Sequence, residues 1–262
     1  MAKIKINDIE MYYEIHGEGK PLVLIEGLGY SSWMWYKQVE ELSKKFKVII
    51  FDNRGVGETD KPDMEYSIEL FADDLADLLS KLEIKKAHVL GVSMGGFIAQ
   101  EFALKYPCMV DKLILCSTSF GGPNSVPIPQ DTLNIMLKGG GQYKSVEEIK
   151  DAIGTALDKD KIQAEVLTKI MEEKMNNPQP KYAYNRQLMA GASFDCEERV
   201  DKIKSETLIL AGKGDRVVPH ENARLLKQKI PCSKVEIIND AGHVFFMEQP
   251  QIANKLIIEF LE

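Results

Sequence analysis

The chain has 262 residues, of which 44% are hydrophobic, and this length allows one large core or a core with a small accessory domain. The formal net charge is −7 and lysines and arginines form no cluster, so neither nucleic acid nor an anionic membrane is an expected partner. No apolar run approaches the roughly eighteen residues of a membrane span, and the N-terminal stretch has no apolar core of a signal peptide. These features predict a cytoplasmic globular protein.

The four cysteines, at positions 108, 116, 196 and 232, form no Cys-x-x-Cys pair and show no metal-ligand spacing with histidine. We interpret them as reduced structural thiols. The sequence thus predicts no metal site and no cofactor.

The first part of the chain alternates strand-like and helix-like segments. Residues 3–15 read as two strands joined at Asn7-Asp8, which is an antiparallel start to a sheet. Further strands are expected at 21–25, 47–51, 88–90 and 113–116, and helices at 33–42, 67–82 and 96–106. The apolar strands are typical of a sheet that is covered on both faces.

The alternation stops after residue 117 and resumes near residue 207. Between them lie several prolines, a glycine break at 139–141, and helical patterns at 145–157, 162–175 and 182–190, the first opening with a capping-box pattern at Ser145. Strands are then expected at 207–210 and 235–238, and helices at 222–228 and 251–260. The pattern predicts an α/β fold with a mainly parallel sheet covered by helices on both faces. Residues 1–120 and 199–262 would form the core, and 121–198 an inserted helical block.

One turn in this pattern has the form of a nucleophile elbow. Gly91-Val92-Ser93-Met94-Gly95 lies directly between the apolar strand at 88–90 and the helix at 96–106. A chain that turns sharply from strand to helix exposes the central serine hydroxyl on a strained backbone, and the helix N-terminus favours developing negative charge there. The glycines leave room for the bend. A dinucleotide or P-loop pattern does not fit, because Ser93 stands where glycine is needed and no Gly-Lys-Ser/Thr follows.

A serine nucleophile needs a base, and the chain has four histidines. His16 and His88 lie inside predicted strands and His220 opens a predicted helix, so structural roles suit them better. His243 follows the last predicted strand in Asp240-Ala241-Gly242-His243. Because catalytic groups gather at the carboxyl ends of strands in such sheets, His243 is the expected base.

The orienting acid is expected to be Asp215, in the loop after the strand at 207–210. Serine, acid and histidine then follow one another in the chain order that this architecture uses. Asp240 is a weaker rival in the short loop of His243. For the oxyanion of a tetrahedral intermediate, the expected donors are the N–H groups of Met94, which follows the nucleophile, and of Leu28 in the loop after residues 21–25.

With these motifs, the sequence resembles the α/β-hydrolase fold, and within it the capped small esterases, enol-lactonases and cofactor-free haloperoxidase-like enzymes. The resemblance is carried by Gly27-Leu28-Gly29 with Trp33, Asp52-Asn53-Arg54-Gly55-Val56-Gly57, Gly91-Val92-Ser93-Met94-Gly95-Gly96, Gly214-Asp215-Arg216-Val217-Val218-Pro219 and Gly242-His243 with Glu248-Gln249-Pro250. It implies that residues 121–198 form a helical cap whose sequence varies with substrate. Members with an aspartate nucleophile are disfavoured because Ser93 is serine.

The chain departs from the family pattern at two positions. Glu26 stands where the family usually has a histidine before the oxyanion residue, and Glu206 stands where proline usually precedes a strand. Backbone donors do not depend on the side chain at position 26, so we expect the oxyanion hole to survive. Glu206 is expected to have no catalytic effect.

These observations predict a serine hydrolase, of the carboxylesterase type, that cleaves carboxylic esters or lactones of small to medium molecules through an acyl-enzyme. Two alternatives stay open: a hydrolase-like binding or signalling protein, and a C–C bond hydrolase or perhydrolase that uses the same triad. The expected partner is a small-molecule ester or lactone. Candidate substrate contacts are Tyr30, Trp33, Met136, Met189 and Phe194.

Overall fold

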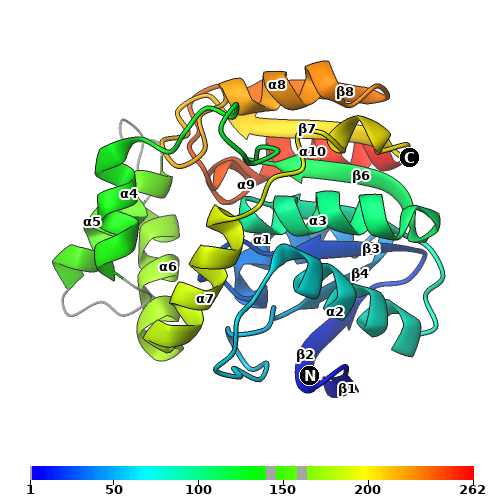
Figure 1. The fold of residues 1–262 in the computed structure, drawn as a ribbon, viewed down its shortest axis with the longest axis horizontal. Helices are drawn as coiled ribbons and strands as arrows, with labels where there is room; N and C mark the ends of the chain where they lie inside the picture. The colour runs from blue at the N-terminus through cyan, green and yellow to red at the C-terminus, as the bar shows by residue number, and fades with distance from the viewer. Residues whose placement is uncertain (1, 140–145, 158–163) are drawn as a thin grey trace.

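The computed structural model describes residues 2–139, 146–157 and 164–262, and within them an eight-stranded sheet (Figure 1). The strand order is β1-β2-β4-β3-β5-β6-β7-β8. The strands span Ala2–Ile6 (β1), Ile9–His16 (β2), Lys20–Ile25 (β3), Phe46–Phe51 (β4), Ala87–Val92 (β5), Val110–Cys116 (β6), Glu206–Gly212 (β7) and Ser233–Ile238 (β8). Only β1 with β2 and β2 with β4 pair antiparallel, so the predicted, mainly parallel sheet is confirmed.

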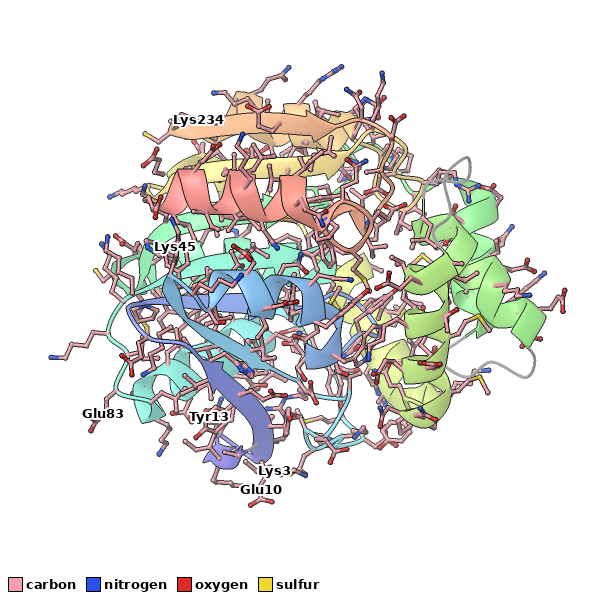
Figure 2. The ribbon with its side chains drawn as sticks, turned by 180° about the vertical axis from the view of Figure 1, so that it is seen from behind. Lys3, Glu10, Tyr13, Lys45, Glu83 and Lys234 are labelled. Carbon is pink, nitrogen blue, oxygen red and sulfur yellow. The ribbon has the colours of Figure 1, made fainter. Side chains whose placement is uncertain are left out.

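Helices cover both faces of this sheet because successive strand residues point to opposite sides and both sets are apolar. One face packs against α2 (Ile68–Lys81), α3 (Met94–Lys105) and α8 (Glu221–Lys229), and the other against α1 (Tyr36–Leu42), α9 (Phe245–Glu248) and α10 (Pro250–Leu261). In Figure 2, seen from behind, α1 and α10 lie in front of the strands. Short 3₁₀ turns at Ser32–Trp35, Pro107–Met109 and Val200–Lys202 complete the core.

The residues described between β6 and β7 include four helices, which form the helical insertion beyond the carboxyl ends of the parallel strands (Figure 1). They are α4 (Gln130–Gly139), α5 (Val146–Ala156), α6 (Ala164–Asn176) and α7 (Lys181–Ala192). The last three correspond to helices expected from the sequence, although the expected starts at residues 145 and 162 lie outside the described residues. Helix α4 was not expected. The carbonyl of Pro129, just before the helix, accepts the N–H of Leu133 at 2.9 Å and so joins the first turn.

In the described part of the chain, no helix combines the length and apolarity that crossing a bilayer requires. The four cysteines are free thiols, with Cys116 and Cys196 buried and Cys108 and Cys232 exposed.

Candidate active site

The turn after β5 holds Ser93 in a backbone conformation that residues with side chains rarely adopt. Its φ is 56° and its ψ is −120°, and α3 begins at the next residue. Hydrogen bonds fix this turn: the Ser93 N–H donates to the Cys116 carbonyl at 2.9 Å, and the Ser93 carbonyl accepts from Gly96 N–H and Thr118 Oγ1, each at 2.9 Å. Strain of this kind persists only where surrounding contacts impose it, and it points to a functional position.

The glycines flanking Ser93 leave room for this bend, as the sequence predicts. Gly91 and Gly95 have ordinary φ values, so Ser93 alone carries the left-handed conformation. A Cβ on Gly91 would lie 2.1 Å from the Gly95 carbonyl oxygen, and a Cβ on Gly95 would lie 2.3 Å from that of Ile25. The glycines therefore let α3 start directly against β3 and β5. The expectation that they leave room for the bend is confirmed.

His243 and Asp215 meet at the carboxyl ends of β7 and β8. His243 Nδ1 and Asp215 Oδ2 are 2.8 Å apart, and both side chains are almost fully buried. The other carboxylate oxygen, Oδ1, accepts the N–H groups of Val217 and Val218, each at 2.8 Å. Asp215 is thereby fixed with one oxygen turned toward the imidazole. Asp240, the rival acid, is exposed.

The loop that carries Leu28 is braced by two buried carboxyl groups. Asp52 Oδ1 accepts the N–H of Ser32 at 2.7 Å, and its Oδ2 accepts the N–H of Glu58 at 2.7 Å. Glu26 Oε1 accepts the N–H of Asn53. These bonds tie the loop after β3 to the loop after β4. They fix the backbone on which Leu28 sits.

Glu26 is fully buried, and its second oxygen, Oε2, has no hydrogen-bond partner among the described residues. Burial, and then the nearby Asp52 carboxylate, raise the pKa of the Glu26 carboxyl well above its usual range. The surroundings of Glu26 therefore oppose a negative charge beside Leu28.

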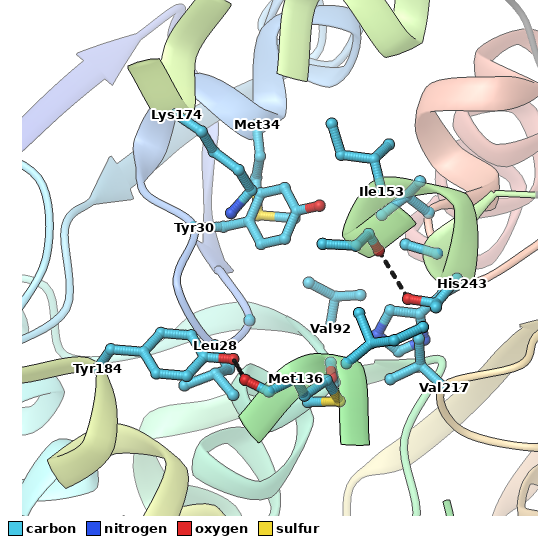
Figure 3. A pocket seen from close by; sticks show the side chains of 17 residues that line it. Leu28, Tyr30, Met34, Val92, Met136, Ile153, Lys174, Tyr184, Val217 and His243 are labelled. Carbon is cyan, nitrogen blue, oxygen red and sulfur yellow. Dashed lines mark hydrogen bonds between the residues drawn. The ribbon is translucent and has the colours of Figure 1, made fainter. Parts of the chain in front are cut away.

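Two cavities meet at Ser93. The histidine cavity is lined by Ser93, His243, residues of the β3 loop and side chains of the helical insertion (Figure 3). The phenylalanine cavity is lined by Ser93, Met94, Phe97 and Phe194, among others, and the two phenylalanine rings stack with centroids 4.8 Å apart. Leu28, Ser93, Met136 and Val217 line both cavities. A substrate bound at Ser93 can thus extend in two directions.

The structure brings some of the expected substrate contacts to these cavities and leaves others away from them. Met136 lines both, Tyr30 lines the histidine cavity, and Phe194 lines the phenylalanine cavity. Trp33 lines neither, and its ring packs beside Tyr30 at 5.4 Å between centroids. Met189 also lines neither cavity, and its side chain is 65% exposed.

Several lining residues were missed by sequence reasoning, above all Lys174 on α6. Its Nζ donates to the Gly29 carbonyl at 3.2 Å and lies 4.3 Å from the centre of the Tyr30 ring. The spacing of residues along α6 could have identified Lys174 from the sequence. Val166 and Ile170 form the buried stripe of α6, and Lys174 stands four residues further along that stripe, where an apolar residue is expected.

The described residues offer no group of three or more His, Cys, Asp or Glu side chains that could hold a metal ion. The site contains the strained turn at Ser93, the hydrogen bond between His243 and the buried Asp215 carboxylate, and the backbone N–H groups at the start of α3. That donor set is suited to acyl transfer.

The fold and the site place the chain in a known class. The family model for the alpha/beta hydrolase fold matches residues 20–250, and the chain belongs to this family. It is an α/β hydrolase.

Known relatives cleave different bonds. The putative carbamate hydrolase RutD of Agrobacterium fabrum is 28% identical over 260 residues, which cover 96% of this chain and 98% of the relative. A thermophilic esterase from Thermogutta terrifontis is 30% identical, with a TM-score of 0.86 and coverage of 100% of this chain and 98% of that one. A meta-cleavage product hydrolase from Pseudomonas fluorescens IP01 is 27% identical, with a TM-score of 0.86 and coverage of 100% and 97%. These relatives share the fold of this chain, but their names state different activities.

Proposed function

We propose that this protein is a serine hydrolase of carboxylic esters or lactones, with Ser93 as nucleophile, His243 as base and Asp215 as orienting acid. The observation that carries the proposal is the buried His243–Asp215 hydrogen bond of 2.8 Å, at a cavity that Ser93 also lines. The strained conformation of Ser93 supports the same assignment. We also propose that the helical insertion acts as a cap, since α4 and α7 line both cavities and α5 and α6 line the histidine cavity.

In this mechanism Asp215 accepts the N–H at His243 Nδ1, which leaves Nε2 to take the proton of the Ser93 hydroxyl. The Ser93 oxygen bonds to the substrate carbonyl carbon, and the N–H groups of Leu28 and Met94 donate to the resulting oxyanion. The tetrahedral intermediate then expels the alkoxide, which takes the proton from His243, and an acyl-Ser93 ester remains. Water attacks this ester with His243 again as base, and the carboxylic acid leaves.

The experiment is steady-state hydrolysis of p-nitrophenyl butyrate by the purified chain and by Ser93→Ala. Product should exceed the protein concentration many times over, at roughly 1 to 10³ turnovers per second. The alanine variant should lose about 10⁴-fold or more of this rate, because the triad acts as a unit.

Two outcomes would contradict the proposal. Release of a single equivalent, followed by no further product on any ester or lactone, would favour a receptor that keeps the triad. Undiminished turnover in Ser93→Ala would place the nucleophile elsewhere. Parallel assays of a lactone and of a vinylogous 1,5-diketone test whether C–C bond cleavage is the faster reaction.

A further inference from the structure

Lys174 stands out because it is a cationic side chain in a cavity that is otherwise mainly apolar. The residues that line the histidine cavity, among those the structure describes, include no aspartate and no glutamate. Besides Lys174, the ionisable lining side chains are His243, which Asp215 orients, and two tyrosines, Tyr30 and Tyr184. Figure 3 shows Lys174 and Tyr30 side by side, with His243 across the cavity.

The fold holds the ammonium group at a defined place. Helix α6 places Lys174 in line with the buried side chains of Val166 and Ile170, so its stem follows the inner face of the insertion. The hydrogen bond to the Gly29 carbonyl and the Tyr30 ring under the ammonium fix its direction. Gly29 directly follows Leu28, so this cation lies next to the loop that would bind the oxyanion.

An ammonium group in such surroundings gains from an anionic ligand. Burial lowers the pKa of Lys174 to about 8, which shows that the site disfavours its charge while leaving most of it protonated at pH 7. A carboxylate brought beside it would form a charge-assisted hydrogen bond, and such bonds are among the stronger ones in proteins. A neutral ligand would offer no such gain.

We propose that Lys174 is a specificity-determining residue that binds a carboxylate on the substrate, so that the preferred substrates are esters or lactones bearing a second, anionic end. This inference rests on the proposed function of the same site. The reacting carbonyl would lie at Ser93, the carboxylate at Lys174, and the uncharged end in the phenylalanine cavity with Phe97 and Phe194.

The test compares charged and neutral esters of similar length in a pH-stat at pH 7. Monoethyl adipate with ethyl heptanoate places the charge on the acyl side, and 4-acetoxybutanoate with pentyl acetate places it on the alcohol side. For each pair the readout is the ratio of kcat/KM for the charged ester to that for the neutral ester. This ratio cancels any general loss of activity that a purely structural role of Lys174 would cause.

In Lys174→Met the ratio should fall by about 10- to 100-fold for at least one pair, mainly through KM, because the variant keeps the stem and removes the charge. Lys174→Arg should retain most of the preference. The matched control is Lys169→Met on the same helix, since Lys169 pairs with Glu173 at 2.6 Å and does not line the histidine cavity. Its ratios should equal those of the wild type.

An unchanged ratio in both pairs, within about twofold, would overturn the inference and leave the proposed function intact. If the wild type hydrolyses no ester, the proposed function fails, but calorimetry still decides the role of Lys174. Monoethyl adipate should bind to Ser93→Ala at least about tenfold more tightly than to Ser93→Ala with Lys174→Met. Equal affinity of these two variants for monoethyl adipate would refute carboxylate binding.

Discussion

Replacing Glu26 by glutamine should stabilise the protein, increasingly so as the pH rises. Glu26 is fully buried, its Oε2 has no hydrogen-bond partner among the described residues, and the neighbouring charge is the Asp52 carboxylate rather than a cation. Glu26→Gln keeps the shape of the side chain and the acceptor for Asn53 N–H. It removes the group whose ionisation the fold opposes.

The pH dependence of the free energy of unfolding follows from the protons bound in the folded and unfolded states. Below the usual carboxyl pKa, 4.5 for glutamate, the folded and unfolded states both hold the proton and the pH has no effect. Above it the unfolded state releases the proton while the folded state retains it, because burial raises the pKa of Glu26. The free energy of unfolding of the wild type therefore falls relative to the variant by about 1.4 kcal/mol per pH unit, until the pH passes the pKa of the folded state.

The assay is urea denaturation of both proteins at unit steps from pH 5 to pH 8. The difference in unfolding free energy should widen with pH at about this slope until the pH passes the pKa of Glu26 in the folded state. Glu10→Gln makes the same chemical change on an exposed side chain and controls for the loss of one negative charge. A difference between Glu26→Gln and wild type that stays constant over the whole range would refute the reasoning, because it would mean that folding does not suppress the ionisation of Glu26.

Three further predictions concern the triad, the core and the cavities. Asp215→Asn should lower kcat by about 10⁴-fold without unfolding the protein, whereas Asp240→Asn should change it little; the reverse order would identify Asp240 as the acid. Arg54→Ala should lower the free energy of unfolding by about 3–5 kcal/mol in urea titrations, because it leaves the buried Asp74 carboxylate without its cationic partner, although the Asn7 amide still donates to it. Arg186→Ala, which breaks an exposed pair, should lower it by less than about 1 kcal/mol, and equal losses would contradict this prediction. Met136→Ala should favour p-nitrophenyl octanoate over acetate by about threefold or more in kcat/KM, since Met136 lines both cavities, and Met189→Ala should not; equal shifts in both would show that the cavities are not where the acyl chain binds.

The sheet could be predicted from the sequence because its signals are local. Apolar runs and turn residues marked the central strands, and the serine turn was recognised from its position between a strand and a helix. The room that Gly91 leaves beside the Gly95 carbonyl is part of the same local turn, and the pattern predicted it. The contact of Gly95 with the Ile25 carbonyl joins distant segments, so the pattern alone could not show it.

The lining of the cavities could be predicted only in part for the same reason. Met136 and Phe194 were recognised as apolar residues of the insertion, but so was Met189, which the fold turns to solvent. An apolar stripe shows which face of a helix is buried and not whether it covers a core or a cavity. Lys174 interrupts such a stripe. Only the position of α6 over the loop after β3 shows that the Lys174 side chain reaches the Gly29 carbonyl.

The central claim is that Ser93 is the nucleophile, and covalent labelling tests it most directly. The protein would be treated with a fluorophosphonate, digested, and the modified peptide sequenced by mass spectrometry. We expect one adduct per chain, on Ser93, and a reaction slowed strongly in His243→Ala because the base that activates the serine is missing. An adduct on another residue, or an unreactive Ser93 in a folded protein, would contradict it.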